Sequence, residues 1–558
     1  MNQPRVCIVA TFPNPRLVNN RLFPHLGPTE AARLQDALTR HALAIGAALA
    51  QKRPVEVELR GCDATPAGLQ GRYRQRGVSY ASQGEGELGE RLSRAADDAG
   101  DRPVLFVLAR SMALTADLLD RALAALSIHP VVLMPTSDGS PCLIGVRNVG
   151  ARFFAGFRGE SAGSVSQLQA SAREMGLSVA MLDPLGEIAS NDAVNSRVAA
   201  DKPADYHPSR LALTGATGSL GGHFLEMVLD ELPQTHVTAL VRTSSDTFRA
   251  PSFQFLISKY ASRLTLIDAD LRSARLSPLE RRQLVEADGG LWHFAASTNL
   301  HAASADANQR IRDINEGGTY GILDTLAASD RPGPFYYVST AYVCGRRTGA
   351  IYEHELKHDC GFRNTYEESK NTAEIRVREA LDAGLNGMVF RPSLVVADQP
   401  GNGPAHITEL LMSACKSAAE RHIRLTLRIP PQAAINAVHD DWTTRALLSL
   451  APFSAARRTY HLTARKDVTM VSFAKAASSI FEGLDLCLAT TDAPIGPSMA
   501  DRLADRMLTP FRPYCDARAK FDRRNLELDA PHLADEADVD PMALLLQRTK
   551  RELGAKIA

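Results

Sequence analysis

Three side chains in the second half of the chain have the types and spacing needed to deliver a proton to a carbonyl oxygen. Thr340 ends the apolar segment "PFYYVST", and Tyr366 and Lys370 follow in "NTYEESK". A tyrosine and a lysine four residues apart share one face of a helix, so the ammonium is expected to lower the phenol pKa from about 10 toward neutrality. Such a phenol exchanges a proton with a carbonyl oxygen as hydride moves, and a threonine hydroxyl stabilises the same oxygen. We predict that all three are catalytic, although a Tyr-x-x-x-Lys pair alone also occurs on exposed helix faces.

A glycine turn is the element expected to hold the hydride carrier. The segment "LALTGATGSLGGHF" predicts a short strand, a turn with Gly215, Gly218 and Gly221, and then a helix. Glycine permits the tight turn and a close approach of backbone to a pyrophosphate, while a helix N-terminus offers N–H groups to the anion. Glycine turns between strand and helix are common, but this position in a strand–helix–strand unit favours a dinucleotide.

The strand after this turn ends in "ALVRTSSD", which places Arg242 where dinucleotide folds bind the adenosine ribose. An acidic residue there accepts from a free 2′-hydroxyl, whereas a guanidinium suits a 2′-phosphate. We therefore expect NADPH (NADP) rather than NAD. Arg249 is a second, weaker candidate, and an exposed arginine at a strand end is the alternative interpretation.

The elements around these motifs predict an α/β chain of several domains. Short β-rich runs alternate with helical patterns over residues 5–185 and again from residue 210, which favours a Rossmann-type doubly wound parallel sheet in the second region. Long helices are expected near 306–328 and 366–383. The predicted organisation is listed by range: an α/β domain at 1–190, a polar linker at 191–208, the nucleotide-binding domain at 209–403 and a mostly helical substrate-binding region at 404–558.

Composition excludes several other classes of protein. Lysine plus arginine and aspartate plus glutamate number 63 each in 558 residues, so no net charge favours nucleic acid. The eight cysteines form no Cys-x-x-Cys pair, which argues against a zinc site and a disulfide framework, and most are expected to be buried and apolar. No run of 18 apolar residues and no signal peptide is evident, so we expect a cytoplasmic protein without a transmembrane segment.

Five motifs in order make residues 210 to about 400 similar to an extended short-chain dehydrogenase/reductase. Besides the glycine turn and the Tyr-Lys pair, these are "DADL", "HFAAST" and "INEGGT". The resemblance implies packing roles for Trp292 and His293. It also implies the following cofactor-binding residues: Gly215, Thr217, Gly218, Ser219, Leu220, Gly221, Arg242, Asp270, Leu271, Ala295, Ala296, Ser297, Asn315, Tyr366, Lys370 and Pro392.

Within that family, "VSTAYV", "NTYEESK" and "FRPSLVV" resemble the thioester reductase and fatty acyl-CoA reductase branch. "INAVHDDW", with His439 in place of a proline, "TYHLTARKDVTM" and "FRPYCDARAKFDRRNLE" resemble its later segments. The branch implies NADPH-dependent reduction of an acyl thioester, on coenzyme A or a carrier protein, to an aldehyde and in some members to an alcohol. The alternatives are a nucleotide-sugar epimerase or dehydratase, a ketoreductase, and a non-enzymatic NADP sensor.

The first domain resembles a bacterial family of glycosyltransferase-A-like proteins through "NNRLFPHLGPTEAARL", "QGEGELGERLSRA" and "PTSDGSPCLIGV". Several residues expected to bind phosphate or metal differ: Asn19, Asn20 and Arg21 replace a Lys-Thr-Arg run, Arg110 replaces an aspartate, and Asp138, Gly139 and Glu187 are what remains of the other segments. Because a metal diphosphate needs convergent carboxylates, we predict no metal site. A degenerate transferase that serves docking, dimerisation or carrier recognition is favoured over a working, metal-independent one, and a homodimer is left open.

Overall fold

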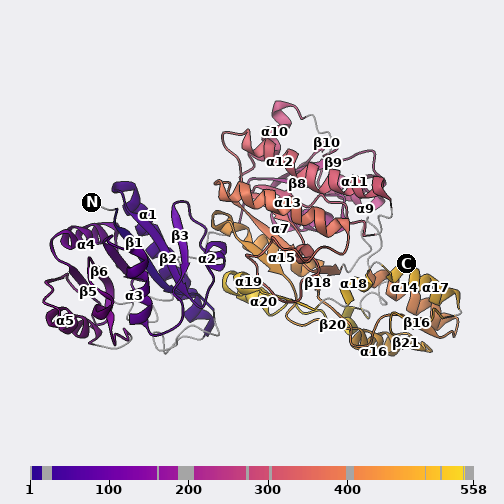
Figure 1. The fold of residues 1–558 in the computed structure, drawn as a ribbon. Helices are drawn as coiled ribbons and strands as arrows, with labels where there is room; N and C mark the ends of the chain where they lie inside the picture. The colour runs from indigo at the N-terminus through magenta and orange to yellow at the C-terminus, as the bar shows by residue number, and fades with distance from the viewer. Residues whose placement is uncertain are drawn as a thin grey trace. The chain divides into compact units, whose positions relative to one another are not determined.

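The computed structural model divides the chain into two compact units, Met1–Pro203 and Ala204–Ala558 (Figure 1). It describes residues 3–14, 28–137, 139–159, 163–185, 206–271, 276–300, 304–396, 407–496, 498–509, 511–515, 518–544 and 546. The division falls within the predicted linker at 191–208, most of which lies outside the described residues.

Unit 1 is a three-layer α/β sandwich around a seven-stranded sheet. The sheet order is β3-β2-β1-β4-β6-β5-β7, and β6 is antiparallel to both of its neighbours. The strands are β1 (Arg5–Thr11), β2 (Glu56–Cys62), β3 (Val78–Ser82), β4 (Val104–Leu108), β5 (Val131–Pro135), β6 (Pro141–Val146) and β7 (Val179–Met181). Strands β3 and β6 were not predicted from the sequence.

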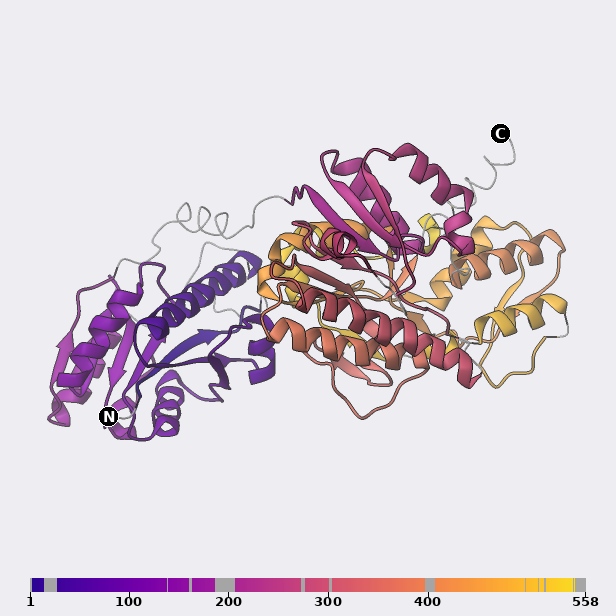
Figure 2. The ribbon, with the colours of Figure 1, turned by 90° about the horizontal axis from the view of Figure 1, so that it is seen from above.

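Helices cover both faces of this sheet, as Figure 2 shows from above. One apolar core joins the sheet to α1 (Pro28–Lys52), α2 (Pro66–Arg72) and α4 (Ala116–Ile128). A second core joins its other face to α3 (Leu88–Ala99), the short η1 (Ala151–Phe154) and α5 (Ser164–Glu174).

Unit 2 contains a parallel seven-stranded sheet in the order β10-β9-β8-β11-β12-β14-β19. All six pairings are parallel, which confirms the doubly wound sheet. The strands are β8 (Arg210–Thr214), β9 (His236–Val241), β10 (Leu264–Asp268), β11 (Leu291–His293), β12 (Phe335–Val338), β14 (Gly387–Pro392) and β19 (Thr459–Leu462). The chain order reverses between β8 and β11, and ligands of such sheets bind at the carboxyl ends of the strands at this point.

Two helical layers enclose the sheet of unit 2. One face packs on α7 (Ser219–Glu231), α9 (Pro251–Lys259) and α15 (Asp440–Leu450). The other face packs on α10 (Pro278–Val285), α12 (Gly318–Ala327) and α13 (Thr365–Asp382). The helix expected at 306–328 begins as α11 (Ala305–Arg312) and contains one π-helical turn, η2 (Asp313–Gly317), before α12.

The C-terminal part of unit 2 does not form one separate helical region. Strand β19 joins the large sheet beside β14, a pairing that was not predicted. A separate apolar core is built by α14 (Ile407–Glu420), β16 (Leu425–Leu427), α16 (Met470–Ile480), β21 (Leu486–Leu488), α17 (Met499–Leu508) and α18 (Arg512–Cys515). Farther along the chain, β22 (Ala519–Phe521) pairs with β13 (Gly349–Ile351).

The smaller elements complete this description. They are α8 (Asp246–Arg249), η3 (Ala341–Cys344), β15 (Leu394–Val396), β17 (Ala434–Ile435), β18 (Ala437–His439), η4 (Ala451–Ala456), β20 (Val468–Thr469), α19 (Arg524–Asp529) and α20 (Pro531–Ala534). Five of the eight cysteines are buried, as expected, and Cys360 is exposed. Among the described helices, none is both long enough and apolar enough to span a bilayer.

A row of aromatic rings crosses the centre of the unit 2 sheet. Trp292 on β11 stacks on Tyr336 of β12 at 4.0 Å between ring centroids, and Phe390 on β14 stacks on Tyr460 of β19 at 5.8 Å. Side chains on one face of neighbouring parallel strands lie side by side, so these large rings fill the layer beneath α7 and α15.

Two histidines are fully buried in the same sheet, His293 on β11 and His461 on β19. Burial penalises the charged imidazole and lowers the pKa of each to about 3. Both side chains are therefore neutral at physiological pH.

These pKa values predict loss of stability in mild acid. The unfolded chain binds protons at both histidines below about pH 6.5, whereas the folded chain does so only near pH 3, so the free energy of unfolding falls as pH decreases between these values. Each histidine contributes a slope of up to about 1.4 kcal/mol per pH unit.

Urea unfolding followed by tryptophan fluorescence checks this, because both tryptophans, Trp292 and Trp442, belong to unit 2. Over the range from about pH 7.5 to about pH 5, where carboxylates contribute little, the slope should be smaller in His293→Asn than in the wild type. His461 and His354, whose pKa is also lowered by burial, supply the remaining slope. A free energy of unfolding that stays constant over this range would contradict the prediction.

Candidate active site

The glycine turn after β8 lies where the chain order of the sheet reverses. Gly215 has φ +78°, and a Cβ at this residue would lie 2.6 Å from the backbone nitrogen of Ala295, which follows β11. At Gly221 an added Cβ would lie 2.3 Å from the Gly215 carbonyl oxygen. Both positions therefore require glycine, for the turn and for the packing of α7 against it.

Gly218 has a different role because it is the N-cap residue of α7 and has no side chain to cap the helix. An added Cβ there would meet only the Gly215 carbonyl oxygen, at 3.3 Å. The first turn of the 13-residue helix α7 therefore lies at the carboxyl ends of the strands, and no N-cap side chain covers its backbone N–H groups. N–H groups and the positive end of a helix dipole suit a pyrophosphate at this position.

Asn315 connects the loop after β11 with α13, the helix that carries Tyr366 and Lys370. Its amide Oδ1 accepts from the Ser297 backbone N–H at 2.7 Å, and its Nδ2 donates to the Ser297 carbonyl at 3.2 Å and to the Ser369 hydroxyl at 2.9 Å. Asn315 lies in the π-helical turn η2 and is buried. Isolated π turns within α-helices are frequent at functional sites.

His293 links the glycine turn to the same π turn. Its Nδ1 lies 2.7 Å from the Thr214 hydroxyl and its Nε2 lies 3.1 Å from the Thr319 hydroxyl, which donates to the Asn315 carbonyl at 2.6 Å. This pattern fits a neutral imidazole with its hydrogen on Nε2. The packing role expected for His293 agrees with this buried position.

Arg242 follows β9 and has a side chain that is 52% exposed, with its guanidinium 3.9 Å from the Asp270 carboxylate. The loop is held by Thr243, which donates its backbone N–H to Asp268 at 2.9 Å. Thr247 donates to the Thr217 hydroxyl of the glycine turn at 3.2 Å. The strand end and the turn therefore form one connected rim with an exposed guanidinium.

The structure thus brings most of the predicted cofactor residues to the carboxyl edge of one sheet. They are Gly215, Thr217, Gly218, Ser219, Leu220 and Gly221 after β8, Arg242 after β9, Asp270 and Leu271 after β10, Ala295, Ala296 and Ser297 after β11, and Pro392 at the end of β14. In a parallel sheet this edge is the ligand-binding edge.

Thr340 and Tyr366 meet at the same edge. Thr340 follows β12 as the N-cap of η3, and Asn364, two residues before Tyr366, caps α13 by accepting from the Glu367 backbone N–H at 3.0 Å. Burial raises the pKa of the Tyr366 phenol to about 12, and its hydrogen bond with the Thr340 hydroxyl opposes this rise. The expected lowering of this pKa toward neutrality is therefore wrong for this structure.

The physical reason is the position of Lys370. Its ammonium donates to the Val338 carbonyl at 2.8 Å and lies 4.2 Å from the Tyr337 ring centroid, where it faces β12. Burial lowers the pKa of Lys370 to about 7, and the nearby Glu374 carboxylate opposes this shift. Tyr366 is consequently protonated at neutral pH, which is the form that donates a proton to an oxyanion.

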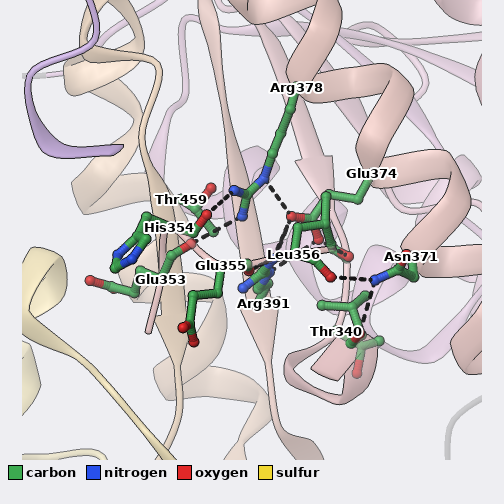
Figure 3. Close-up of polar contacts among 12 residues, drawn as sticks. Thr340, Glu353, His354, Glu355, Leu356, Asn371, Glu374, Arg378, Arg391 and Thr459 are labelled. Carbon is green, nitrogen blue, oxygen red and sulfur yellow. Dashed lines mark hydrogen bonds and ion pairs between the residues drawn. The ribbon is translucent and has the colours of Figure 1, made fainter. Parts of the chain in front are cut away.

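A buried polar cluster beneath these residues was not predicted (Figure 3). The Glu374 carboxylate accepts from Ser339 at 2.7 Å, from Arg378 at 2.9 Å and from Arg391 at 2.8 Å. His461 Nε2 accepts from Arg391 at 3.1 Å. The two arginines lower the pKa of Glu374 to about 2 although the side chain is fully buried.

Two sequence signals could have indicated this cluster. Arg391 interrupts the otherwise apolar strand "GMVFRPSLV", and Glu374 lies one helical turn after Lys370. A charge within an apolar strand requires a buried partner of opposite sign, and a carboxylate on the catalytic helix is the natural candidate.

The cluster extends to the C-terminal segment resembling the branch's late "FD-x-x-N" element. The Glu353 carboxylate accepts from the His461 backbone N–H at 3.0 Å and from the Asn525 backbone N–H at 2.9 Å. Asn525 also donates to the Thr459 carbonyl at 2.9 Å. This segment therefore links β19 to Glu353, which follows β13.

The residues at the start of α13 also contact α18, which belongs to the separate apolar core of unit 2. Asn364 donates to the Tyr514 hydroxyl of α18 at 2.9 Å, and Arg363 donates to the Pro513 carbonyl at 3.2 Å. Tyr514 packs edge-on against Tyr342 with 4.8 Å between ring centroids. Helix α18 therefore lies against the helix that carries Tyr366.

In unit 1, Arg110 follows β4 and donates to the Gly159 carbonyl at 3.1 Å. Asp138, Glu187 and the Asn19–Arg21 run lie outside the described residues, and Gly139 adopts φ +81°. Within the described part of the chain, no group of three histidine, cysteine, aspartate or glutamate side chains is placed to hold a metal ion.

Two known families match this chain, one within each unit. Residues 213–447 match a family described as male sterility protein, an NAD-binding family, and residues 42–159 match a family described as an uncharacterized protein conserved in bacteria. The second match covers much of unit 1, whose α/β fold is compatible with a glycosyltransferase-A-like domain.

Individual relatives match unit 2. A nonribosomal peptide synthetase (asaC) from Aspergillus flavus is 28% identical over 280 residues, which is 45% of this chain and 26% of the synthetase. Fatty acyl-CoA reductase 1 from Gallus gallus is 28% identical over 302 residues, which is 46% of this chain and 57% of the reductase. The chain therefore spans about a quarter to just over half of these curated relatives.

A solved structure agrees with the fold. The terminal R domain from the myxalamid PKS-NRPS biosynthetic pathway superposes with a TM-score of 0.50 at 22% identity, covering 63% of this chain and 92% of that domain. By its motifs, its sheet and these relatives, unit 2 resembles the thioester reductase branch of the extended short-chain dehydrogenase/reductases.

Proposed function

We propose that this protein reduces an acyl thioester to an aldehyde with NADPH as the reductant. The observation that carries the proposal is the pair of hydroxyls, Thr340 and Tyr366, beside a glycine turn that can accommodate a pyrophosphate. Lys370 lies one helical turn after Tyr366 at the same edge of the sheet. This arrangement supplies a proton donor and an oxyanion-binding group where a nicotinamide would lie.

The reaction divides between the cofactor and the chain. When bound, the reduced nicotinamide supplies the hydride that adds to the thioester carbonyl carbon. Thr340 and Tyr366 donate hydrogen bonds to the carbonyl oxygen, and Tyr366, protonated at neutral pH, transfers its proton to the developing oxyanion. The resulting hemithioacetal breaks its carbon–sulfur bond, so the products are an aldehyde and a thiol.

Lys370 would hold the ribose of the cofactor and supply charge beside Tyr366. A lysine with a pKa near 7 changes protonation state within the physiological range. We therefore assign it to binding and to restoring the Tyr366 proton.

The relatives support a proposed substrate class. Two of them are a nonribosomal peptide synthetase and a fatty acyl-CoA reductase, and the solved domain is a terminal R domain of a biosynthetic pathway. We propose that the substrate is an acyl group bound as a thioester to coenzyme A or to a carrier protein. We also propose that the separate apolar core of unit 2, which includes α18, contributes to its binding.

The hydroxyl pair predicts a sharp mutational signature. Tyr366→Phe should lower kcat by about 100- to 10,000-fold, the usual contribution of a positioned general acid. Thr340→Ala should lower kcat by about 100- to 1,000-fold, the effect of removing one oxyanion donor. NADPH oxidation, followed by absorbance with a panel of acyl-CoA and acyl-carrier thioesters and with trapping of the aldehyde, measures both.

Thr340→Ser keeps the hydroxyl and is the matched control, with activity near that of the wild type. Cofactor binding should survive in Tyr366→Phe. The contrary outcome is a wild-type protein that binds NADPH, fails to oxidise it with any thioester of the panel, and instead turns over a nucleotide sugar or a small ketone. That result would replace the proposal with the epimerase or ketoreductase alternative.

The choice of NADPH rests on Arg242, whose exposed guanidinium lies at the end of β9. Loss of a charge-assisted hydrogen bond to a 2′-phosphate costs about 1.5–3 kcal/mol, so Arg242→Ala should reduce kcat/KM for NADPH by about 10- to 100-fold and leave that for NADH nearly unchanged. Arg249→Ala, at the second candidate, an arginine that is 66% exposed on α8, should lower kcat/KM for NADPH less than Arg242→Ala does. Equal loss with both cofactors would indicate a structural role for Arg242.

For unit 1 we propose a recognition role without sugar transfer. The supporting observation is Arg110, a cation at the position of a metal-binding aspartate, with its guanidinium bonded to the Gly159 carbonyl. A cation at this position repels a divalent ion instead of binding it.

Thermal unfolding with UDP- and GDP-sugars, with and without manganese, should show no metal-dependent shift, whereas NADPH should stabilise unit 2 in the same sample by the ordinary linkage of binding to folding. A manganese-dependent shift with a sugar nucleotide would overturn this proposal.

A further inference from the structure

The buried carboxylate of Glu374 contacts each element that carries a catalytic group. It lies on α13 one turn after Lys370, accepts from Ser339 beside Thr340, and is paired with Arg391 beside Pro392. Ser339, Glu374 and Arg391 are all buried. Water therefore cannot take the place of Ser339 or Arg391 as a hydrogen-bond donor to Glu374 unless the structure changes.

The contacts have a directional geometry. Arg391 directs Nε toward both Glu374 oxygens, at 3.2 and 3.1 Å, and its NH2 group toward Oε1 at 2.8 Å, while Ser339 occupies Oε2 at 2.7 Å. Figure 3 shows Arg378 and Arg391 converging on this carboxylate. Such paired, charge-assisted bonds restrict both distance and rotation.

We propose that Glu374 is a positioning residue that sets the spacing among Thr340, Tyr366, Lys370 and the end of β14. The inference rests on the proposed reductase function, and it extends that function to a residue that contacts neither substrate nor cofactor in the proposed reaction. The carboxylate acts through Ser339 on Thr340, through its own helix on Tyr366 and Lys370, and through Arg391 on β14. A displacement of about 1 Å at the reacting groups costs up to about 100-fold in rate.

Charged and titratable groups around the pair come from several elements. Lys370 faces Glu374 on α13, Tyr337 on β12 and His293 on β11. Glu374 faces Arg378 on its own helix, Arg391 on β14, His461 on β19 and Tyr337 on β12. Because Glu374 opposes the lowering of the Lys370 pKa, its neutralisation should lower that pKa further.

Two variants test the proposal. Ser339→Ala removes only the link to the catalytic strand and leaves both ion pairs in place, so kcat should fall about 10-fold or more with KM and the melting temperature close to wild type. Glu374→Gln should lower kcat further and move the alkaline limb of the kcat profile to lower pH. If Glu374→Gln does not fold, the kcat of Ser339→Ala decides alone.

Asp529→Asn is the matched control, because Asp529 forms another ion pair in unit 2 with the buried Arg458, which precedes β19 at the amino edge of the parallel sheet, whereas Thr340 follows β12 at the carboxyl edge. It should lower the melting temperature and leave kcat and the pH profile unchanged. The proposal is overturned if Ser339→Ala and Glu374→Gln retain wild-type kcat and pH profile, or if Asp529→Asn lowers kcat equally.

A measurement independent of turnover separates this proposal from the proposed function. The pKa of Lys370, followed by NMR of lysine labelled at Cε and assigned with Lys370→Arg, should fall in Glu374→Gln and stay constant in Asp529→Asn. A wild-type protein without turnover would reject the proposed function, while an unchanged Lys370 pKa in Glu374→Gln would reject the coupling between these residues.

Discussion

A carboxylate without exposed surface imposes a strict requirement on unit 2. Removing an unpaired charge from water is so costly that such a group persists only with full compensation. Glu374 receives it from Arg378 on its own helix and from Arg391 on β14, and Arg391 is itself bonded to His461 on β19. The need to satisfy one buried charge thus holds α13, β14 and β19 in a common arrangement.

The same polar interior determines which proton chemistry the site favours. A phenol buried beside a threonine hydroxyl keeps its proton, and a lysine buried beside an aromatic ring loses its proton unusually easily. A carbonyl reduction consumes one proton for each hydride. In the proposed reaction, Tyr366 donates the proton and Lys370, with a pKa near 7, restores it, which suits reduction better than an ionised phenol would.

Local sequence was sufficient to predict the glycine turn, the helix that carries Tyr366 and Lys370, and the parallel sheet, because each depends on spacing within one short segment. Gly215 and Gly221 are required by contacts within the turn itself and with the strand beside it. The partners of Arg391 could not be read in this way, since Glu374 and His461 lie 17 and 70 residues away. The pKa of Tyr366 was mispredicted for a related reason. Helical spacing shows that Tyr366 and Lys370 share one face of a helix, but it does not show that the Lys370 ammonium binds the Val338 carbonyl of β12.

The contact between Glu353 and Asn525 spans 172 residues of chain and completes the cluster beneath the active site. Strand β19, the edge strand of the sheet that pairs with β14 at Arg391, likewise follows β14 by more than 65 residues in the chain. During synthesis on the ribosome, unit 1 has all of its residues available long before unit 2 can close its sheet. The polar cluster around Glu374 is therefore completed late, when the segment near Asn525 has emerged.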